Sequence, residues 1–207
     1  TELTQLNLPK IEDYSLIILN ELESVPAYLS SSLKNYLEKG GNVVIIPSEK
    51  LDRPSYSQLF KVLNMGVLND SVRKRTAINR IDYENPFFKN VFENKEENFA
   101  YPHAELKYNT TLNYHTGLIF FEDNSPFLSK LNRKQGNLYW FSSPLNQEIS
   151  NFLKSPLIVP TFFNFGLENF SKTPLFYRAG RRTEFSADIL PGNEEVMHLK
   201  NEDTDFI

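Results

Sequence analysis

The sequence predicts an α/β fold, in which helices cover both faces of a mainly parallel sheet. Two apolar runs without alternation, residues 14–19 and 42–46, are typical of parallel strands buried on both faces. A segment with helical spacing of apolar residues lies between them, so a strand, a helix and a strand follow one another as a right-handed βαβ unit. A chain of 207 residues, 40% hydrophobic and 23% charged, suits one main domain with a small appendage.

The helix between the two runs has start and stop signals. Ser24 is a suitable N-cap, with Pro26 in the first turn. Lys39 lies in the last turn, where a cation favours the helix dipole, and Gly40-Gly41 can adopt the left-handed conformation that ends a helix. Its apolar face consists of Val25, Tyr28, Leu29, Leu33, Tyr36 and Leu37. We therefore expect this face to pack on the sheet.

A second helix is expected after Asp52 and Pro54, with one apolar face formed by Tyr56, Leu59, Phe60 and Leu63. Beyond residue 66 the pattern changes to strands, expected at residues 67–68, 76–83, 104–114, 117–122 and 137–142. Asn109-Thr110 is a candidate break within the third of these. The turn signal Gln135-Gly136-Asn137 predicts a hairpin that ends in the last one. We expect these strands to extend the sheet or to form an antiparallel flank.

Two further apolar segments predict helices, at residues 85–92 and 155–170. The second is expected to be buried, with Pro160 near its start, because only Lys154 and Lys172 flank it and a membrane-surface helix carries more cations. From Thr173 the pattern changes again: residues 183–189 alternate, a turn is expected at 191–193, and 195–200 can pair back. We therefore divide the chain into an α/β domain, 1–172, and a short C-terminal β element, 173–207.

Composition excludes several classes of function. The net charge is -4 and Lys and Arg are scattered, so no nucleic-acid partner is expected, and the cluster Arg73-Lys74-Arg75 with Arg80 is typical of a solvated face. The chain has no cysteine, hence no thiolate nucleophile and no Cys-ligated metal. It has no Gly-rich phosphate loop and no apolar stretch long enough to cross a bilayer. We expect no cofactor.

Two places remain for chemistry. Pro47-Ser48 follows the second strand, where hydrolytic α/β folds place a nucleophile, but Pro47 has no nucleophilic atom and Ser48 lacks flanking glycines. His103 and Glu105 share a strand face, and His115 would approach them as a metal site if the chain turned at Asn109. A polar residue at a strand end and histidines bonded to neighbouring hydroxyls or carbonyls are the structural alternatives.

The stretch 14–48, YSLIILNELESVPAYLSSSLKNYLEKGGNVVIIPS, resembles the middle of a class I glutamine amidotransferase-like domain. In that flavodoxin-like fold a buried strand leads through a helix to a Gly-Gly pair, and the next strand delivers the nucleophilic cysteine. Matched strand to strand, the cysteine position falls on Pro47 or within one residue of it. The resemblance therefore implies an inactive domain.

The wider pattern resembles the soluble part of bacterial aerotolerance-regulator (Bat-type) membrane proteins. The residues that carry this likeness are 85–88 with 91–92, 135–139 before 143–145, and 156–163. The resemblance implies a non-catalytic binding or scaffolding domain on the extracytoplasmic face of a bacterial membrane. It would bind unknown protein partners and touch the membrane only through segments outside this chain.

Two other functions stay open, and one structural expectation follows. A degenerate amidotransferase-like hydrolase would act through Ser48 or a His103/His115 site, whereas a carbohydrate-binding module would use Tyr101, Tyr108 and Tyr114. Only thirteen residues precede Tyr14, so we also expect a missing neighbour beside the first strand. The exposed edge would then allow self-association.

Overall fold

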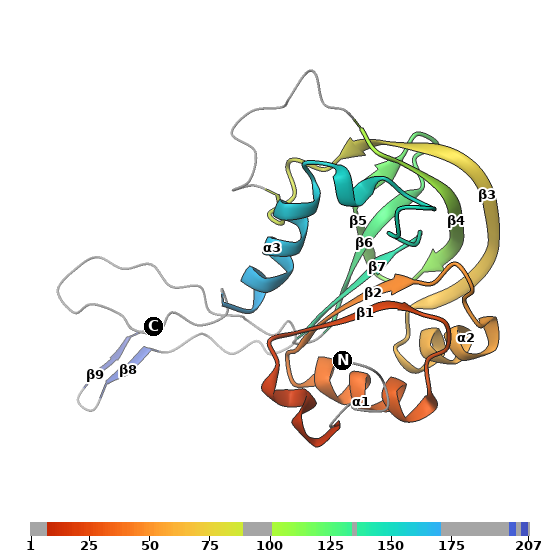
Figure 1. Cartoon of the computed structure of the whole chain (residues 1–207). Helices are drawn as coiled ribbons and strands as arrows, with labels where there is room; N and C mark the ends of the chain where they lie inside the picture. The colour runs from red at the N-terminus through yellow and green to blue at the C-terminus, as the bar shows by residue number, and fades with distance from the viewer. Residues whose placement is uncertain (1–7, 89–100, 134–135, 171–198, 202–203, 207) are drawn as a thin grey trace. The chain divides into compact units, whose positions relative to one another are not determined.

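A seven-stranded mixed sheet organises residues 1–172, the first of two units into which the chain divides; the second is 173–207 (Figure 1). The computed structural model describes residues 8–88, 101–133, 136–170, 199–201 and 204–206. The strand order is β1-β2-β7-β6-β5-β3-β4. The strands are β1 (Leu16–Leu22), β2 (Asn42–Pro47), β3 (Gly66–Ile81), β4 (His103–Leu112), β5 (His115–Phe121), β6 (Pro126–Asn132) and β7 (Asn137–Phe141). The predicted α/β class is confirmed.

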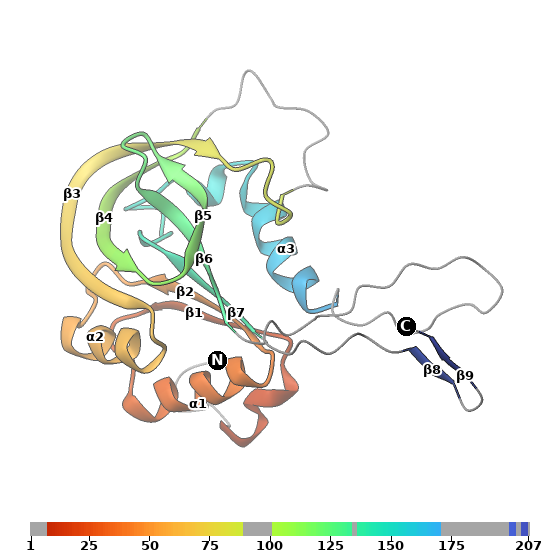
Figure 2. The ribbon, with the colours of Figure 1, turned by 180° about the vertical axis from the view of Figure 1, so that it is seen from behind.

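Helices lie on both faces of this sheet (Figures 1 and 2). They are α1 (Ala27–Glu38), α2 (Arg53–Val62) and α3 (Ile158–Phe170), with short 3-10 helices η2 (Leu8–Asp13) and η3 (Phe152–Lys154). The α1 and α2 layer packs on Val43 and Ile45 of β2, whereas the α3 layer packs on Val44 and Ile46. Because side chains alternate along a strand, β2 is buried at every position between two cores.

The βαβ unit forms as the sequence predicts, with one correction. β1 and β2 are parallel, and α1 connects them. At the end of α1, Gly40 has a φ of 97°, and the amides of Gly40 and Gly41 donate to the carbonyl oxygens of Leu37 and Tyr36, which closes the helix. The predicted cap by Ser24 is wrong, because Pro26 occupies the N-cap position and no side chain caps the helix.

The α2 helix has the predicted cap: the carboxylate of Asp52 accepts from the amide of Ser55 at 3.0 Å. Its predicted apolar residues, Tyr56, Leu59, Phe60 and Leu63, are buried. Phe60 packs edge-on against Trp140 of β7, with ring centroids 5.0 Å apart. The apolar face of α2 therefore belongs to the hydrophobic core that also contains Trp140 of the central strand β7.

The antiparallel part differs from the prediction in three strands, β3, β4 and β6, and for β6 the sequence predicted no range of its own. Separate strands are predicted at residues 67–68 and 76–83, but β3 runs without a gap from Gly66 to Ile81, is exposed along most of its middle, and ends before residues 82–83. The expected break at Asn109-Thr110 is wrong, since β4 continues to Leu112 and the chain turns at Asn113-Tyr114. The predicted hairpin at Gly136 is confirmed, with Asn132 opposite Asn137.

β4, the last strand in the order of the sheet, curls back toward the middle of the sheet, as Figures 1 and 2 show. On β4, the amide of Tyr108 donates to the carbonyl oxygen of Ser142 at 2.7 Å, just beyond β7. The amide of Glu105 donates to the carbonyl oxygen of Ile149 at 2.8 Å. Backbone groups of β4 therefore find partners outside the β3–β4 ladder.

The helix predicted for residues 155–170 forms, but only one of its faces is buried. Phe165 is fully buried and lies 4.5 Å from the ring of Tyr139, whereas Val159 and Phe163 are 72% and 61% exposed. The buried-helix prediction is therefore wrong for the outer face. Residues 85–88 form turns, so the described part of the segment 85–92 is not the predicted helix, and 89–92 lie outside the described residues.

In the second unit, β8 (Leu199–Asn201) and β9 (Thr204–Phe206) pair antiparallel. The strand predicted at 183–189 and the turn at 191–193 lie outside the described residues. Across the described ranges of both units, no helix combines the length and the apolar character needed to span a membrane.

Candidate functional site

The carboxyl ends of the parallel strands β1, β2 and β7 are the first place to look for a site, because open α/β sheets bind their ligands there. At this edge β1 reaches Glu21, β2 reaches Pro47 and Ser48, and β7 is followed by residues 142–146. The predicted nucleophile position therefore lies at the edge where a catalytic group would belong.

Ser48 is held as a structural residue. It is buried, its Oγ accepts from the amide of Lys50 at 3.1 Å, and its carbonyl oxygen accepts from the hydroxyl of Tyr108 at 2.7 Å. Pro47 stands opposite Leu22 in the β1–β2 ladder. Among the described residues, no histidine or carboxylate hydrogen-bonds to Ser48 Oγ, so the activating base of a serine nucleophile is not assembled here.

Two buried tyrosines close the same edge. The hydroxyl of Tyr56 donates to the carbonyl oxygen of Leu22 at 2.7 Å, and that of Tyr108 also lies 3.1 Å from the carbonyl oxygen of Glu49. Burial raises the pKa of both Tyr56 and Tyr108. The hydroxyls therefore remain protonated donors and fix the ends of β1 and β2.

Glu21 fills the space between β1 and the segment after β7. It is the extra residue of a β-bulge, between the pairs Asn20–Ile46 and Leu22–Pro47, and has a φ of 51°. Its Oε1 accepts from the amides of Leu145 at 2.8 Å and Asn146 at 2.7 Å, and its Oε2 accepts from Asn146 Nδ2 at 2.8 Å. All these bonds are internal, so this carboxylate acts as a clamp on the 145–146 segment.

A buried cation lies on the inner side of β4. Lys107 Nζ hydrogen-bonds to a carboxylate oxygen of Asp123 and lies 3.0 Å from Ser125 Oγ. Burial alone would raise the pKa of Asp123, but the hydrogen bonds from Lys107 and Ser125 outweigh it and lower that pKa to about 2. The pair joins β4 to the turn between β5 and β6.

The predicted metal residues are brought together only in part. His103 Nε2 lies 3.7 Å from Glu105 Oε1, and His103 Nδ1 lies 3.3 Å from Arg75 Nη2. His115 is at the other end of β4, where its Nδ1 lies 3.1 Å from the carbonyl oxygen of Leu112. Over the described ranges, no three His, Asp or Glu side chains are grouped so that they could hold a metal ion.

The aromatic residues suggested for a carbohydrate site do not share a surface. Tyr108 is buried inside the sheet, as described above. Tyr101 precedes β4, and Tyr114 is at the turn after it, 85% exposed. The length of a ten-residue strand therefore separates the two exposed rings.

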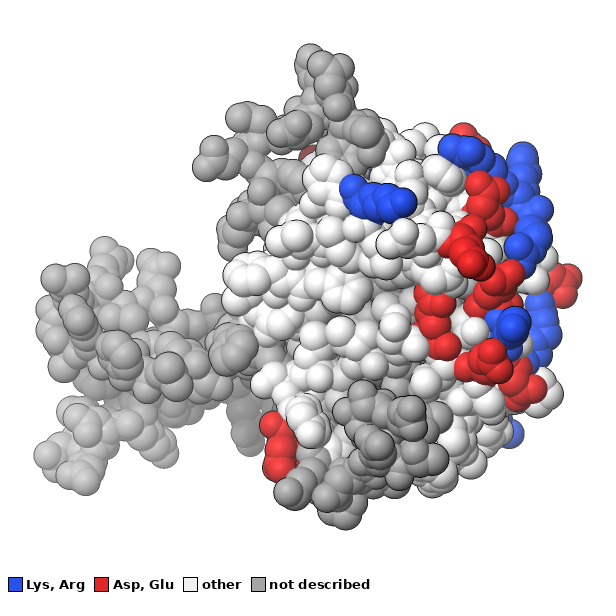
Figure 3. Space-filling view, viewed as in Figure 1, with Lys and Arg blue, Asp and Glu red and all other residues white. Residues whose placement is uncertain are grey.

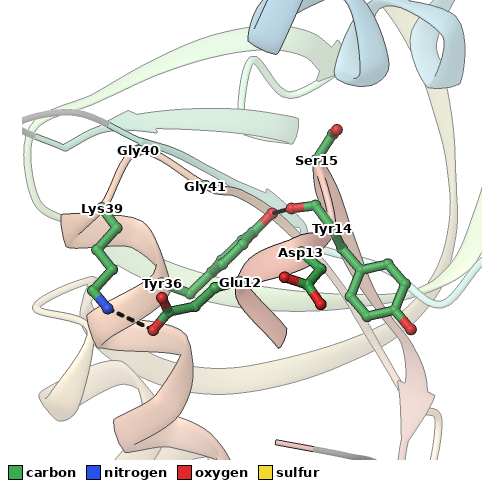
Figure 4. Close-up of a pocket in the computed structure, with 8 residues that line it drawn as sticks. All are labelled: Glu12, Asp13, Tyr14, Ser15, Tyr36, Lys39, Gly40 and Gly41. Atoms are coloured by element: carbon green, nitrogen blue, oxygen red, sulfur yellow. Dashed lines mark hydrogen bonds and ion pairs between the residues drawn. The ribbon is translucent and has the colours of Figure 1, made fainter. Parts of the chain in front are cut away.

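Two hollows of the described surface lie away from the carboxyl ends of β1, β2 and β7. One, of about 320 Å³, is at the amino ends of β1 and β2 and is shown in Figure 4; its lining includes Glu12, Asp13, Tyr14 and Lys39. The Lys39 ammonium pairs with Glu12 at 2.6 Å, and the Tyr36 hydroxyl donates to the carbonyl oxygen of Tyr14 at 2.6 Å, so several of its polar groups bond one another.

A second hollow, of about 280 Å³, lies between the ends of α1 and α2 and is lined by Lys34, Leu37, Glu38, Val62, Leu63, Asn64 and Arg133. Arg133 Nη2 donates to the carbonyl oxygen of Leu63 at 2.9 Å. Burial lowers the pKa of Arg133. Its guanidinium thus binds the carbonyl oxygen at the end of α2, and Lys34 and Glu38 are the other charged residues of the lining.

Sequence reasoning found Pro47 and Ser48 but missed the residues that occupy the same edge. Glu21 carries no local signal of its role, since its partners Leu145 and Asn146 lie more than a hundred residues away in the sequence. Tyr108 is one of the three tyrosines suggested for a carbohydrate site, yet it is buried. Neither sequence environment carries a local signal for these long-range bonds.

No protein-family model and no curated protein matches the chain. Among solved structures, it is similar to the cytoplasmic protein STM3548 from Salmonella typhimurium, at 16% identity and a TM-score of 0.58, over 76% of this chain and 72% of that one. It is also similar to the N-terminal domain of mmIFT52, at 13% identity and a TM-score of 0.52, over 80% and 81%. A cold-adapted β-galactosidase from Rahnella sp. R3 matches at 14% identity and a TM-score of 0.51, over 78% of this chain but only 23% of that one. At these identities the likeness shows a shared α/β fold.

Proposed function

We propose that this chain is a non-catalytic binding or scaffolding domain, with the amidotransferase-like, flavodoxin-like arrangement that its first strands resemble. By the same resemblance, it is the soluble part of a membrane-anchored protein similar to Bat-type aerotolerance regulators, on the extracytoplasmic face. The observation that supports this proposal best is made at the carboxyl ends of β1, β2 and β7. We call this place the occupied edge, because its polar groups already have partners within the chain. Its groups serve internal bonds, from Tyr56 to Leu22, from Tyr108 to Ser48 and from residues 145–146 to Glu21.

The occupied edge favours binding over catalysis for a physical reason. A nucleophile needs a base within hydrogen-bond reach and donors aimed at the developing oxyanion. At this edge Ser48 Oγ is engaged by the amide of Lys50, and the amides of Leu145 and Asn146 are engaged by Glu21. The backbone donors that would stabilise a charged intermediate therefore already have an anion.

The test of non-catalysis compares the chain with two serine variants. Release of ammonia from glutamine and hydrolysis of simple esters should stay at the level of buffer for the unmodified chain, Ser48→Ala and Ser32→Ala, the last being a partly exposed serine on α1 whose hydroxyl donates to the carbonyl oxygen of Tyr28. Turnover that Ser48→Ala abolishes and Ser32→Ala retains would refute the proposal. The partner is sought by cross-linking and pull-down of the full-length protein from its own membrane, where a stoichiometric protein partner is expected.

The location needs its own measurement. The similar Salmonella protein is described as cytoplasmic, and that description concerns the Salmonella protein. Protease added to spheroplasts should digest this domain if it lies on the extracytoplasmic face. Full protection until the membrane is lysed would contradict that part of the proposal and leave the non-catalytic role to be judged by the assay above.

A further inference from the structure

The outer side of β1 is an open edge in the described part of the sheet. β1 pairs with β2 on one side, from Leu16 opposite Asn42 to Leu22 opposite Pro47, and stands first in the strand order, so no described strand pairs with its other side. The opposite edge strand, β4, donates amide hydrogens to the segment after β7. The fold therefore provides hydrogen-bond partners for backbone amides of the edge strand β4. It leaves the outer side of the other edge strand, β1, open to pairing with an added strand.

Both faces beside this open edge are apolar. Leu19 belongs to the core on the α1 side with Ile17 packed against it, and Leu16 packs against the core on the α3 side. Ile18 alternates with them and is 38% exposed. A strand added here would lie between two helical layers, so it needs apolar side chains on both of its faces.

The α3 helix continues the apolar surface next to β1. It contacts both β1 and β2, and its outer face presents Val159 and Phe163. No charged residue occurs from Ser155 to Leu167. Figure 3 shows the same segregation: the charged side chains gather over β3, β4 and α2, whereas the surface over α3 is almost free of them. Contiguous exposed apolar surface of this kind is typical of interaction sites.

We propose that β1 of a second copy of this chain occupies the edge, antiparallel to the first across a two-fold axis. The occupant must be extended, uncharged and apolar on both faces. β1 itself meets these conditions over residues 16–19, and the carboxylate of the one acid within it, Glu21, accepts hydrogen bonds from the amides of residues 145 and 146. A two-fold pairing closes on itself and gives each copy the neighbour that it lacks. This inference holds whether or not the carboxyl edge is catalytic.

The test measures association and identifies its surface. Sedimentation of the chain over a wide concentration range should show a monomer–dimer equilibrium. Ile18→Lys places a charge against the apolar neighbour strand and should raise the dimer dissociation constant at least about tenfold. Tyr28→Lys, at a side chain that is 51% exposed on α1, should leave the constant unchanged.

Hydrogen exchange of the unmodified chain provides the second measurement, which needs no variant to fold. Amides within residues 16–20 should become more protected as concentration rises. A chain that stays monomeric at millimolar concentration overturns the proposal. A dimer that Ile18→Lys does not weaken, or that protects α3 without protecting β1, overturns it equally. Glutaminase activity in a chain that still dimerises would refute the non-catalytic role alone.

Discussion

Replacing Glu21 tests the clamp that closes the carboxyl edge. Glu21→Ala removes the carboxylate that accepts from the amides of Leu145 and Asn146 and from Asn146 Nδ2. It leaves alanine in a left-handed backbone conformation, at a φ of 51°. Glu21→Gly removes the same bonds but fits that conformation. The pair of variants therefore separates the hydrogen bonds from the backbone strain.

The expected costs follow from these contacts. A hydrogen bond to a charged group contributes about 1.5–3 kcal/mol, and a backbone amide left without a partner in a buried site costs about 1–3 kcal/mol. The site is half-buried, so water replaces part of what is lost. We expect Glu21→Ala to lower the free energy of unfolding by about 2–4 kcal/mol, and Glu21→Gly to lower it by about 1 kcal/mol less, because glycine adopts a positive φ without the steric penalty.

The assay is urea unfolding followed by tryptophan fluorescence, since the one tryptophan, Trp140, is buried in β7. Glu23→Ala is the matched control, an exposed acid two residues away, and should change the free energy of unfolding by less than about 0.5 kcal/mol. A cost for Glu21→Ala no larger than that of the control would refute the clamp. Equal costs for the alanine and glycine variants would refute the strain.

Three further outcomes are expected. The pKa of Asp123 is about 2 in the folded protein against 3.8 for the free group, so its pairing stabilises the fold above about pH 4. That contribution is lost as the pH falls toward 2. Asp123→Asn should therefore flatten this part of a titration of the free energy of unfolding against pH. Phe165→Ala should cost about 3–5 kcal/mol in urea unfolding, whereas Phe163→Ala, in dilute monomer, should cost less than about 0.5 kcal/mol. Asp52→Ala should cost about 1 kcal/mol through its lost cap, whereas Ser24→Ala, which removes no cap, should be nearly neutral by the same measurement. A larger cost for Phe163→Ala than for Phe165→Ala would contradict the packing of Phe165, and a larger cost for Ser24→Ala than for Asp52→Ala would contradict the cap. An acid titration of stability that Asp123→Asn leaves unchanged would contradict the pairing of Asp123.

Elements with local signals were predictable from the sequence. Asp52 lies next to the helix that it caps, and Gly40 lies at the end of α1 where a positive φ is needed. The buried run of β2 and the turn before β7 also depend only on neighbouring residues. Ser24 shows the limit of such reasoning, since either Ser24 or Pro26 suits the start of α1 and the sequence alone does not rank them.

Elements that depend on distant partners were not predictable. The middle of β3 is polar and exposed, so it lacks the apolar pattern of a strand, and its pairing with β4 keeps it extended. The outer face of α3 was expected to be buried because its composition is apolar, but composition does not reveal which neighbours exist. At the candidate site, Tyr108 reaches Ser48 from sixty residues away, a contact that requires the curl of the whole sheet.

The occupied edge also has a consequence for protein engineering. A thiol introduced at position 47 or 48 would meet a tyrosine hydroxyl bound to the Ser48 carbonyl and a carboxylate bound to the amides of residues 145–146. The tyrosine, Tyr108, and the carboxylate, Glu21, belong to different strands, and each also holds a loop in place. Replacing either to create space for a substrate would therefore destabilise the structure that a new catalytic group needs. Installing catalysis here is therefore a problem of several simultaneous changes, and single-residue libraries at this edge should yield unstable proteins before active ones.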